Sequence, residues 1–199
     1  NSDGSGISEV VPLELSLGTP LNKFSPVWSP DGSRIAFVFR GRVDIVNADG
    51  RNRSTLLAPS GVRKLDFSPD GSTIIFDRTG DFGTRKIFSM NADGTNVVQL
   101  TSAGRNAVYS PNGFRIAFID GNSVMTMNAD GTNIEPFLTP AQDGIGTVES
   151  RPQWSPDGQS IAYFSDASGE YELVISDQKG EQRTFIPLGK RSFFYNPLW

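Results

Sequence analysis

The stretch PVWSPDG at residues 26–32 decides the fold, because close copies of it return along the chain. The turn within it begins at Ser29, Ser68, Ser110 and Ser155, so successive copies are 39, 42 and 45 residues apart. Each copy is followed by a short apolar run, of which residues 35–37 (IAF) are the first. Self-similarity at a nearly fixed period of this length indicates an architecture of stacked copies of one supersecondary unit.

The repeated turns have a sequence that closes a hairpin. Proline presets φ near −65°, Asp or Asn tolerates the next position, and Gly takes the positive φ that completes the turn. The residues expected to serve only turn geometry are Asp31, Gly32, Asp70, Gly71, Asn112, Gly113, Asp157 and Gly158. A second turn, Asn-Ala-Asp-Gly, follows at residues 47–50, 91–94 and 128–131, and the fourth copy departs from it at residues 176–180.

Between the turns lie runs rich in Ile, Val, Phe and Tyr, which read as strands, and nothing shows a sustained helical period. In the first copy the predicted strands are residues 27–29, 34–39, 42–47 and 54–57. Four antiparallel strands per repeat is the pattern of a propeller blade. The sequence therefore predicts an all-β fold, a β-propeller of four-stranded antiparallel blades with four complete blades plus parts of a fifth.

The motifs resemble those of the TolB-type, WD-repeat-like β-propeller family. The resemblance rests on residues 26–32 and 152–158, on MNADGTN at 90–96 and 127–133, and on Leu100-Thr101. It extends from about Phe24 to the C-terminus. It implies an N-terminal segment with an outer blade strand at 1–23, blades at about 24–62, 63–105, 106–150 and 151–195, and the start of the next at 196–199.

Propellers of this family usually close with six or more blades, and this chain has fewer. An open arc would leave apolar blade faces in water. Three alternatives follow: the chain is a fragment of a longer protein, it shares a ring with a second copy, or it closes on itself with a split fifth blade.

The composition excludes several classes of chemistry. The chain has no Cys and no His, which removes the commonest nucleophile–base pairs and transition-metal ligands. A net charge of −4 argues against nucleic acid, and no apolar run approaches the roughly 20 residues of a membrane span. The turn aspartates lie one blade apart and do not converge as Ca²⁺ ligands must. We therefore expect no catalysis, cofactor, metal or membrane insertion.

The loops opposite the repeated turns are the candidate binding surface, because variable loops usually carry function. These loops contain more basic than acidic residues, which favours an acidic partner. The alternative is that they are ordinary solvated loops whose charges are compensated by nearby acidic residues. Phe82 is a candidate exposed anchor. The candidate binding residues are Arg63, Lys64, Arg78, Phe82, Arg85, Arg105, Arg151, Lys190 and Arg191.

Aromatic residues recur at one place in the repeat and are expected to pack between blades, with sugar stacking as the alternative. They are Trp28, Phe67, Tyr109, Trp154 and Trp199. Residues 193–195 (FFY) offer either further packing between blades or an interface hot spot.

Three functions remain open. The first is a non-catalytic protein-binding domain, which the resemblance places in the periplasm or outside the cell. The second is a structural or assembly module that self-associates through open blade edges. The third is a propeller domain that gates or accompanies a hydrolase or lyase.

Overall fold

The computed structural model describes residues 26–57, 60–80, 83–138, 151–166, 170–177 and 182–189. These residues form four four-stranded antiparallel sheets and no α-helix, with the strands of each sheet in chain order. The all-β, four-bladed prediction is confirmed. The segments predicted to begin a fifth blade and to form the first outer strand lie outside the described residues.

The strands of the four blades have the following bounds. Blade 1 contains β1 (Val27–Trp28), β2 (Arg34–Phe39), β3 (Arg42–Asn47) and β4 (Ser54–Leu57). Blade 2 contains β5 (Val62–Phe67), β6 (Thr73–Thr79), β7 (Arg85–Asn91) and β8 (Val98–Gln99). Blade 3 contains β9 (Arg105–Tyr109), β10 (Arg115–Asp120), β11 (Ser123–Asn128) and β12 (Glu135–Leu138). Blade 4 contains β13 (Gln153–Trp154), β14 (Ser160–Ser165), β15 (Tyr171–Asp177) and β16 (Arg183–Gly189).

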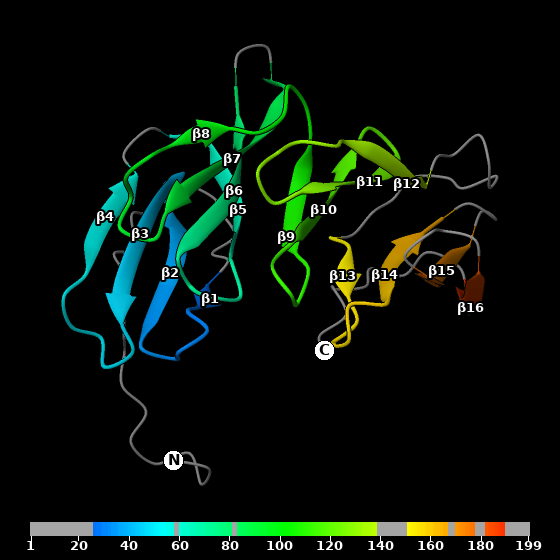
Figure 1. Ribbon diagram of the computed structural model, residues 1–199, viewed down its shortest axis with the longest axis horizontal. Helices are drawn as coiled ribbons and strands as arrows, with labels where there is room; N and C mark the ends of the chain where they lie inside the picture. The colour runs from blue at the N-terminus through cyan, green and yellow to red at the C-terminus, as the bar shows by residue number, and fades with distance from the viewer. Residues whose placement is uncertain are drawn as a thin grey trace, which may run out of the picture.

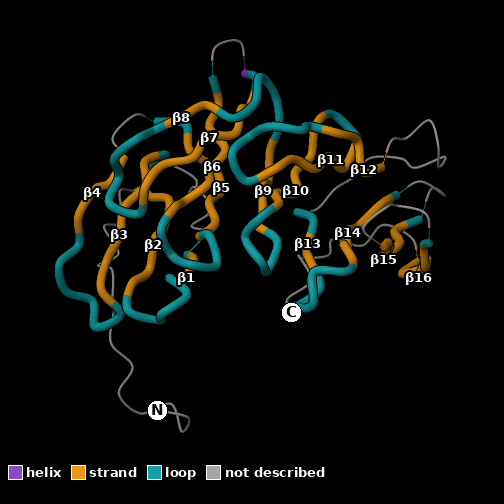
Figure 2. Tube along the Cα trace, in the orientation of Figure 1, coloured by secondary structure: helices purple, strands orange, loops and turns teal. Residues whose placement is uncertain are grey.

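The blades follow one another along an arc (Figure 1). The first strands, β1, β5, β9 and β13, lie on its inner side, and the last strands lie on its periphery. Figure 2 shows strands and the loops and turns between them as the predominant structure of the described residues. Neighbouring inner strands are in contact, β1 with β5, β5 with β9 and β9 with β13. Consecutive blades therefore lie against one another around a common centre.

In each blade, the turn between the first and second strands is closed by a hydrogen bond from its serine hydroxyl to the side chain of its Asp or Asn. The Ser29 hydroxyl donates to Asp31 at 2.6 Å, and the Gly32 amide donates to the Ser29 carbonyl at 2.8 Å. In the third copy the Ser110 hydroxyl donates to the Asn112 side-chain carbonyl at 2.7 Å. An amide thus replaces the carboxylate without loss of the turn, as turn chemistry predicts.

In blades 1 to 3 both hairpin turns lie on one face of the disc. The Ala48 amide of the second turn donates to the Ser33 carbonyl of the first at 2.9 Å, and the same bond recurs from Ala92 to Ser72 and from Ala129 to Phe114. We call this the turn face. On the opposite, variable-loop face, the Val62 amide entering blade 2 donates to the Gly41 carbonyl of the β2–β3 loop at 2.8 Å.

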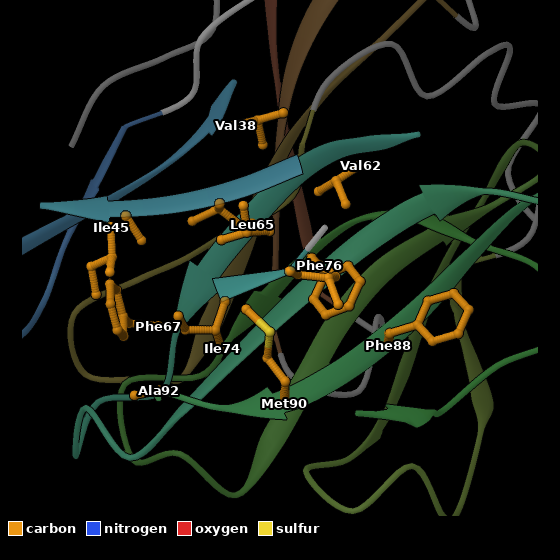
Figure 3. Close-up of a cluster of buried hydrophobic side chains, with 13 residues drawn as sticks. Val38, Ile45, Val62, Leu65, Phe67, Ile74, Phe76, Phe88, Met90 and Ala92 are labelled. Atoms are coloured by element: carbon orange, nitrogen blue, oxygen red, sulfur yellow. The ribbon is translucent and has the colours of Figure 1, made fainter. Parts of the chain in front are cut away.

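The hydrophobic core consists of layers between consecutive blades, and Figure 3 shows the layer between blades 1 and 2. Ile45 of blade 1 lies there beside Phe67 of blade 2, with Phe76 stacked on Phe88 at a centroid distance of 5.6 Å. Two similar layers join blades 2 and 3 and blades 3 and 4. Burying a large apolar side chain contributes about 1.5–3 kcal/mol, so each blade depends on its neighbour.

The recurring aromatic position distinguishes covered blades from an uncovered one. Phe67, Tyr109 and Trp154 are buried in the layers, and Trp154 is only 9% exposed. Packing between blades is therefore confirmed for these three. Trp28 is 57% exposed, because no described blade precedes β1. For Trp28 the packing expectation is wrong within the described residues, and Trp199 lies outside them.

Candidate functional site

The predicted basic residues lie around the variable-loop face of blades 2 to 4. Arg63 and Lys64 are in β5, Arg78 and Arg85 flank the β6–β7 loop, and Arg105 begins β9. Arg151 lies two residues before β13. Phe82, Lys190, Arg191 and residues 193–195 lie outside the described residues. Among the described set, Arg63 is exposed, and the others are partly buried.

Arg151 connects three blades through their inner strands. Its Nη2 lies 3.1 Å from Asp66 Oδ1 of β5 and donates to the Ala107 carbonyl of β9 at 3.0 Å. The second Asp66 oxygen accepts the Tyr109 amide at 3.0 Å. Burial raises the pKa of Asp66, and the Arg151 charge and the Tyr109 amide oppose that rise. Arg151, with a side chain 17% exposed, therefore serves the packing of the blades.

Arg85 compensates a second buried carboxylate. Its Nε lies 3.3 Å from Asp77 Oδ2 on the neighbouring strand, and the Asn106 amide donates to Asp77 Oδ1 at 3.3 Å. Burial raises the pKa of Asp77, while the charges of Arg85, Arg151 and, more weakly, Lys64 lower it. The structure thus gathers these three basic residues around Asp66 and Asp77.

Arg78 has a different partner, since its guanidinium lies over the Phe88 ring, 4.7 Å from the centroid.

A small hollow opens on the variable-loop face between blades 2 and 3, with a volume of about 230 Å³. Arg85, Arg105 and Asp120 line it together with three glycines. Arg105 is oriented by a bond from its Nη1 to the Gly121 carbonyl at 3.0 Å. At Gly104, which has a φ of +133°, a Cβ would lie 2.9 Å from the Phe118 ring. The glycine therefore allows the close packing that shapes the hollow.

A larger groove of about 610 Å³ lies on the turn face between the same two blades. Its lining includes Asp70, Tyr109, Phe114 and Asp130, and the Tyr109 hydroxyl lies 2.9 Å from Thr73 Oγ1. Phe114 is 74% exposed. Sequence reasoning assigned this face to turn geometry and missed the groove. The available signal was Phe114 itself, which stands where the first two repeats have Ser.

The turn aspartates are engaged separately, each within its own turn. The Ser29 hydroxyl, followed by the Ser33 amide and hydroxyl, lowers the pKa of Asp31 to about 2. Hydroxyl and amide donors likewise lower the pKa values of Asp70, Asp93, Asp130 and Asp157.

A search of the described part of the chain reveals no group of three or more His, Cys, Asp or Glu residues placed to hold a metal ion. In that same part of the chain, no helix has the length and apolar character required to cross a membrane.

Comparison with known proteins agrees with this architecture. Dipeptidyl-peptidase 5 of Porphyromonas gingivalis is 31% identical over 176 residues, which cover 83% of this chain and 24% of that protein. An uncharacterized protein of Agrobacterium fabrum is 31% identical over 185 residues, covering 79% of this chain and 62% of that protein. The chain thus spans about a quarter of one curated relative and less than two thirds of the other.

Solved structures share the fold at low identity. A TolB-type protein of Agrobacterium tumefaciens superposes with a TM-score of 0.72 at 19% identity, covering 82% of this chain and 61% of that one. An oligogalacturonate lyase in complex with manganese gives 0.63 at 16% identity, covering 82% and 52%. The family model described as the TolB beta propeller domain matches residues 16–199. This chain therefore belongs to the TolB β-propeller domain family.

Proposed function

We propose that the chain is the non-catalytic, protein-binding part of a larger TolB-type propeller protein of the periplasm or the extracellular space. The chain covers only part of the length of its relatives, which supports its being part of a larger protein. Its membership of the TolB family supports a place in the periplasm or outside the cell. The observation that carries the binding role is the hollow on the variable-loop face that Arg85 and Arg105 line. The partner that we propose presents an acidic side chain to this hollow.

The size and lining of the hollow support this partner. At about 230 Å³ it is below the roughly 300–1,000 Å³ of sites that enclose whole small ligands, and it suits a single inserted side chain. Guanidinium groups bind carboxylates with directional, charge-assisted hydrogen bonds. Arg85 and Arg105 both line the hollow, and we expect both to contribute to binding. Arg105 is the residue to test, because a change at Arg85 would also remove the cation that faces the buried Asp77.

The test is a titration with a fluorescein-labelled decapeptide of alternating Glu and Gly, followed by fluorescence anisotropy at low salt. We expect Arg105→Ala to weaken binding about fivefold to tenfold, equivalent to roughly 1–1.4 kcal/mol. Arg63→Ala is the matched control, because Arg63 is exposed on β5 and does not line the hollow. Equal weakening by both variants, or equal binding of a Gln–Gly peptide, would contradict the proposal.

Catalysis by the chain itself is the competing function, since the relatives include a dipeptidyl-peptidase and the structural neighbours include a lyase. A propeller domain beside a hydrolase or lyase would fit these likenesses as well. We expect the purified chain to release no nitroaniline from dipeptide nitroanilides and to leave oligogalacturonate intact. Turnover of either substrate that scales with protein concentration would overturn the non-catalytic proposal.

Assembly is a second candidate function, and the exposure of Trp28 favours it. At the other end of the arc, Phe185, Ile186 and Leu188 of β16 are also exposed. Apolar surfaces of this kind mark places where another chain or blade docks. Light scattering at micromolar concentration should show self-association that Trp28→Gln reduces, and a strictly monomeric chain would count against assembly.

A further inference from the structure

The groove on the turn face is lined by residues at two positions where the four repeats differ from one another. At the first position of the second strand, blades 1 and 3 carry Arg34 and Arg115, whereas blades 2 and 4 carry the short residues Thr73 and Ser160. In blade 2 this difference removes a long cationic side chain from the rim and leaves the Thr73 hydroxyl paired with Tyr109. One position after the turn glycine, Phe114 replaces a serine. The short Thr73 side chain leaves room in the groove, and Phe114 adds an aromatic wall.

The Phe114 ring is not needed for the turn that carries it. The fold uses its backbone: the amide donates to Asn112 Oδ1 at 3.1 Å, and the carbonyl accepts the Ala129 amide at 2.9 Å. In blade 2 the equivalent Ser72 bonds the turn carboxylate of Asp70. Phe114 forgoes that side-chain bond and is 74% exposed beside a concave surface.

The groove is negatively charged. Asp70 and Asp130 line it, and donors within their own turns lower the pKa of each carboxyl, so both are ionised at neutral pH. Neither belongs to any of the ion pairs found among the described residues. Arg115, the cation nearest in sequence to Phe114, pairs with Glu135 and donates to Thr126 Oγ1 at 2.7 Å.

We propose that this groove binds a lysine or arginine side chain carried by an extended segment of a protein partner. The aliphatic stem packs on Phe114 and Pro69, and the cationic end lies near the carboxylates of Asp70 and Asp130. A cation close to an aromatic face increases affinity by about twofold to fivefold at an exposed site. An exposed carboxylate increases affinity by up to about fivefold, and this gain becomes smaller as the salt concentration rises.

Charge selects this occupant over the alternatives. An acidic segment would face two carboxylates, with the only cation beside Phe114 in sequence already paired. A neutral oligosaccharide could stack on Phe114 but would gain nothing from the net charge of the groove. This site lies on the face opposite the Arg105 hollow, so either proposal can fail without the other.

The test uses a fluorescein-labelled octapeptide with two arginines among Gly and Ser, titrated with the whole chain at low ionic strength. We expect Phe114→Ser, which restores the serine of the first two repeats, to weaken binding about threefold to fivefold. Asp130→Asn should weaken it about twofold to fivefold, and the affinity of the unmodified chain should fall in 300 mM salt. The matched controls are Gln159→Ser and Asp157→Asn, which make similar changes in blade 4, outside the groove. They should leave the affinity unchanged.

Four outcomes would overturn the proposal. They are no detectable binding at 1 mM chain, equal binding of a matched peptide with two glutamates, equal weakening by the blade 4 controls, and binding of maltotetraose that depends on Phe114 but not on Asp130. Circular dichroism of every variant separates loss of the groove from loss of the fold.

Discussion

The two faces of the junction between blades 2 and 3 use charge in opposite ways. On the variable-loop face, Arg85 and Arg151 are bound to the buried carboxylates of Asp77 and Asp66. On the turn face, the hydrogen bonds that Asp70 and Asp130 accept from described residues come from hydroxyl and amide groups of their own turns, and no ion pair among those residues includes either carboxylate. The loops that vary in sequence are thus tied into the fold, while the repeated turns leave net charge exposed.

The difference follows from the cost of burying charge. A carboxylate withdrawn from water needs a cation and hydrogen-bond donors, and the basic residues near Asp66 and Asp77 supply them. A carboxylate in an exposed hairpin turn needs only local donors and keeps its solvation. A basic residue in a variable loop is therefore evidence for a binding surface only where it also lines a hollow, as Arg105 does, and an exposed aromatic residue in a repeated turn beside a groove is evidence of the same kind.

The largest effect on stability should come from Arg151→Met, which removes the ion pair between Arg151 and the buried Asp66. It leaves Asp66 without its cation and should lower the free energy of unfolding by about 3 kcal/mol at pH 7. Because burial raises the pKa of Asp66 and Arg151 opposes that rise, the loss applies above the folded pKa. It becomes smaller as the pH falls through that pKa toward pH 3, below the ordinary Asp value of 3.8. Urea denaturation at both pH values measures it. Arg63→Met, at an exposed position, should change stability by less than about 0.5 kcal/mol, and an equal effect would refute the pairing.

The next effect should come from glycines on the turn face. Gly94 has a φ of +88°, and a Cβ there would lie 2.6 Å from the Leu56 carbonyl oxygen of blade 1. Gly94→Ala should therefore combine backbone strain with a clash between blades, about 2–3 kcal/mol in total. Gly32 has a φ of +70° and open space where a Cβ would lie, so Gly32→Ala should cost only about 1–2 kcal/mol. Thermal unfolding distinguishes them, and equal losses would show that the turns do not contact the preceding blade.

A smaller effect is expected from Asp31→Asn, measured as a function of pH. The folded pKa of Asp31, about 2, lies below the unfolded value, so its contribution is present above about pH 4 and is lost as the pH falls through the folded pKa. The variant should be less stable than the unmodified chain at pH 7 and nearly equal to it at pH 2. If the difference in stability between the variant and the unmodified chain did not change with pH, the hydrogen bonds of the turn would not be stabilising the ionised form of Asp31.

The smallest effect on stability should come from Phe114→Ser, which tests whether the exposed aromatic ring on the turn face serves binding and not packing. Since the Phe114 ring is largely exposed, unfolding in urea should change by less than about 0.5 kcal/mol, while binding of the arginine peptide weakens. A large loss of stability would instead make Phe114 a packing residue and remove the reason for assigning it to a partner.

The sequence by itself determined the blades. Hairpin turns, strand length and the choice of proline, Asp and glycine act over a few residues, so a repeat of 39–45 residues specified the strands of the first blade almost to the residue. It also identified the aromatic position that Phe67, Tyr109 and Trp154 bury between blades.

Only the tertiary structure decided which charged residues have partners and where the surface is concave. Asp66 and Arg151 lie in different repeats, and only the meeting of inner strands around one centre brings them to 3.1 Å. The groove beside Phe114 likewise depends on side chains from two blades. The burial of Trp154 and the exposure of Trp28 at the same repeat position depend on whether a preceding blade is there to cover the ring. The conformation of a turn is determined by adjacent residues, whereas burial, ion pairing and surface shape depend on residues that are distant in the chain.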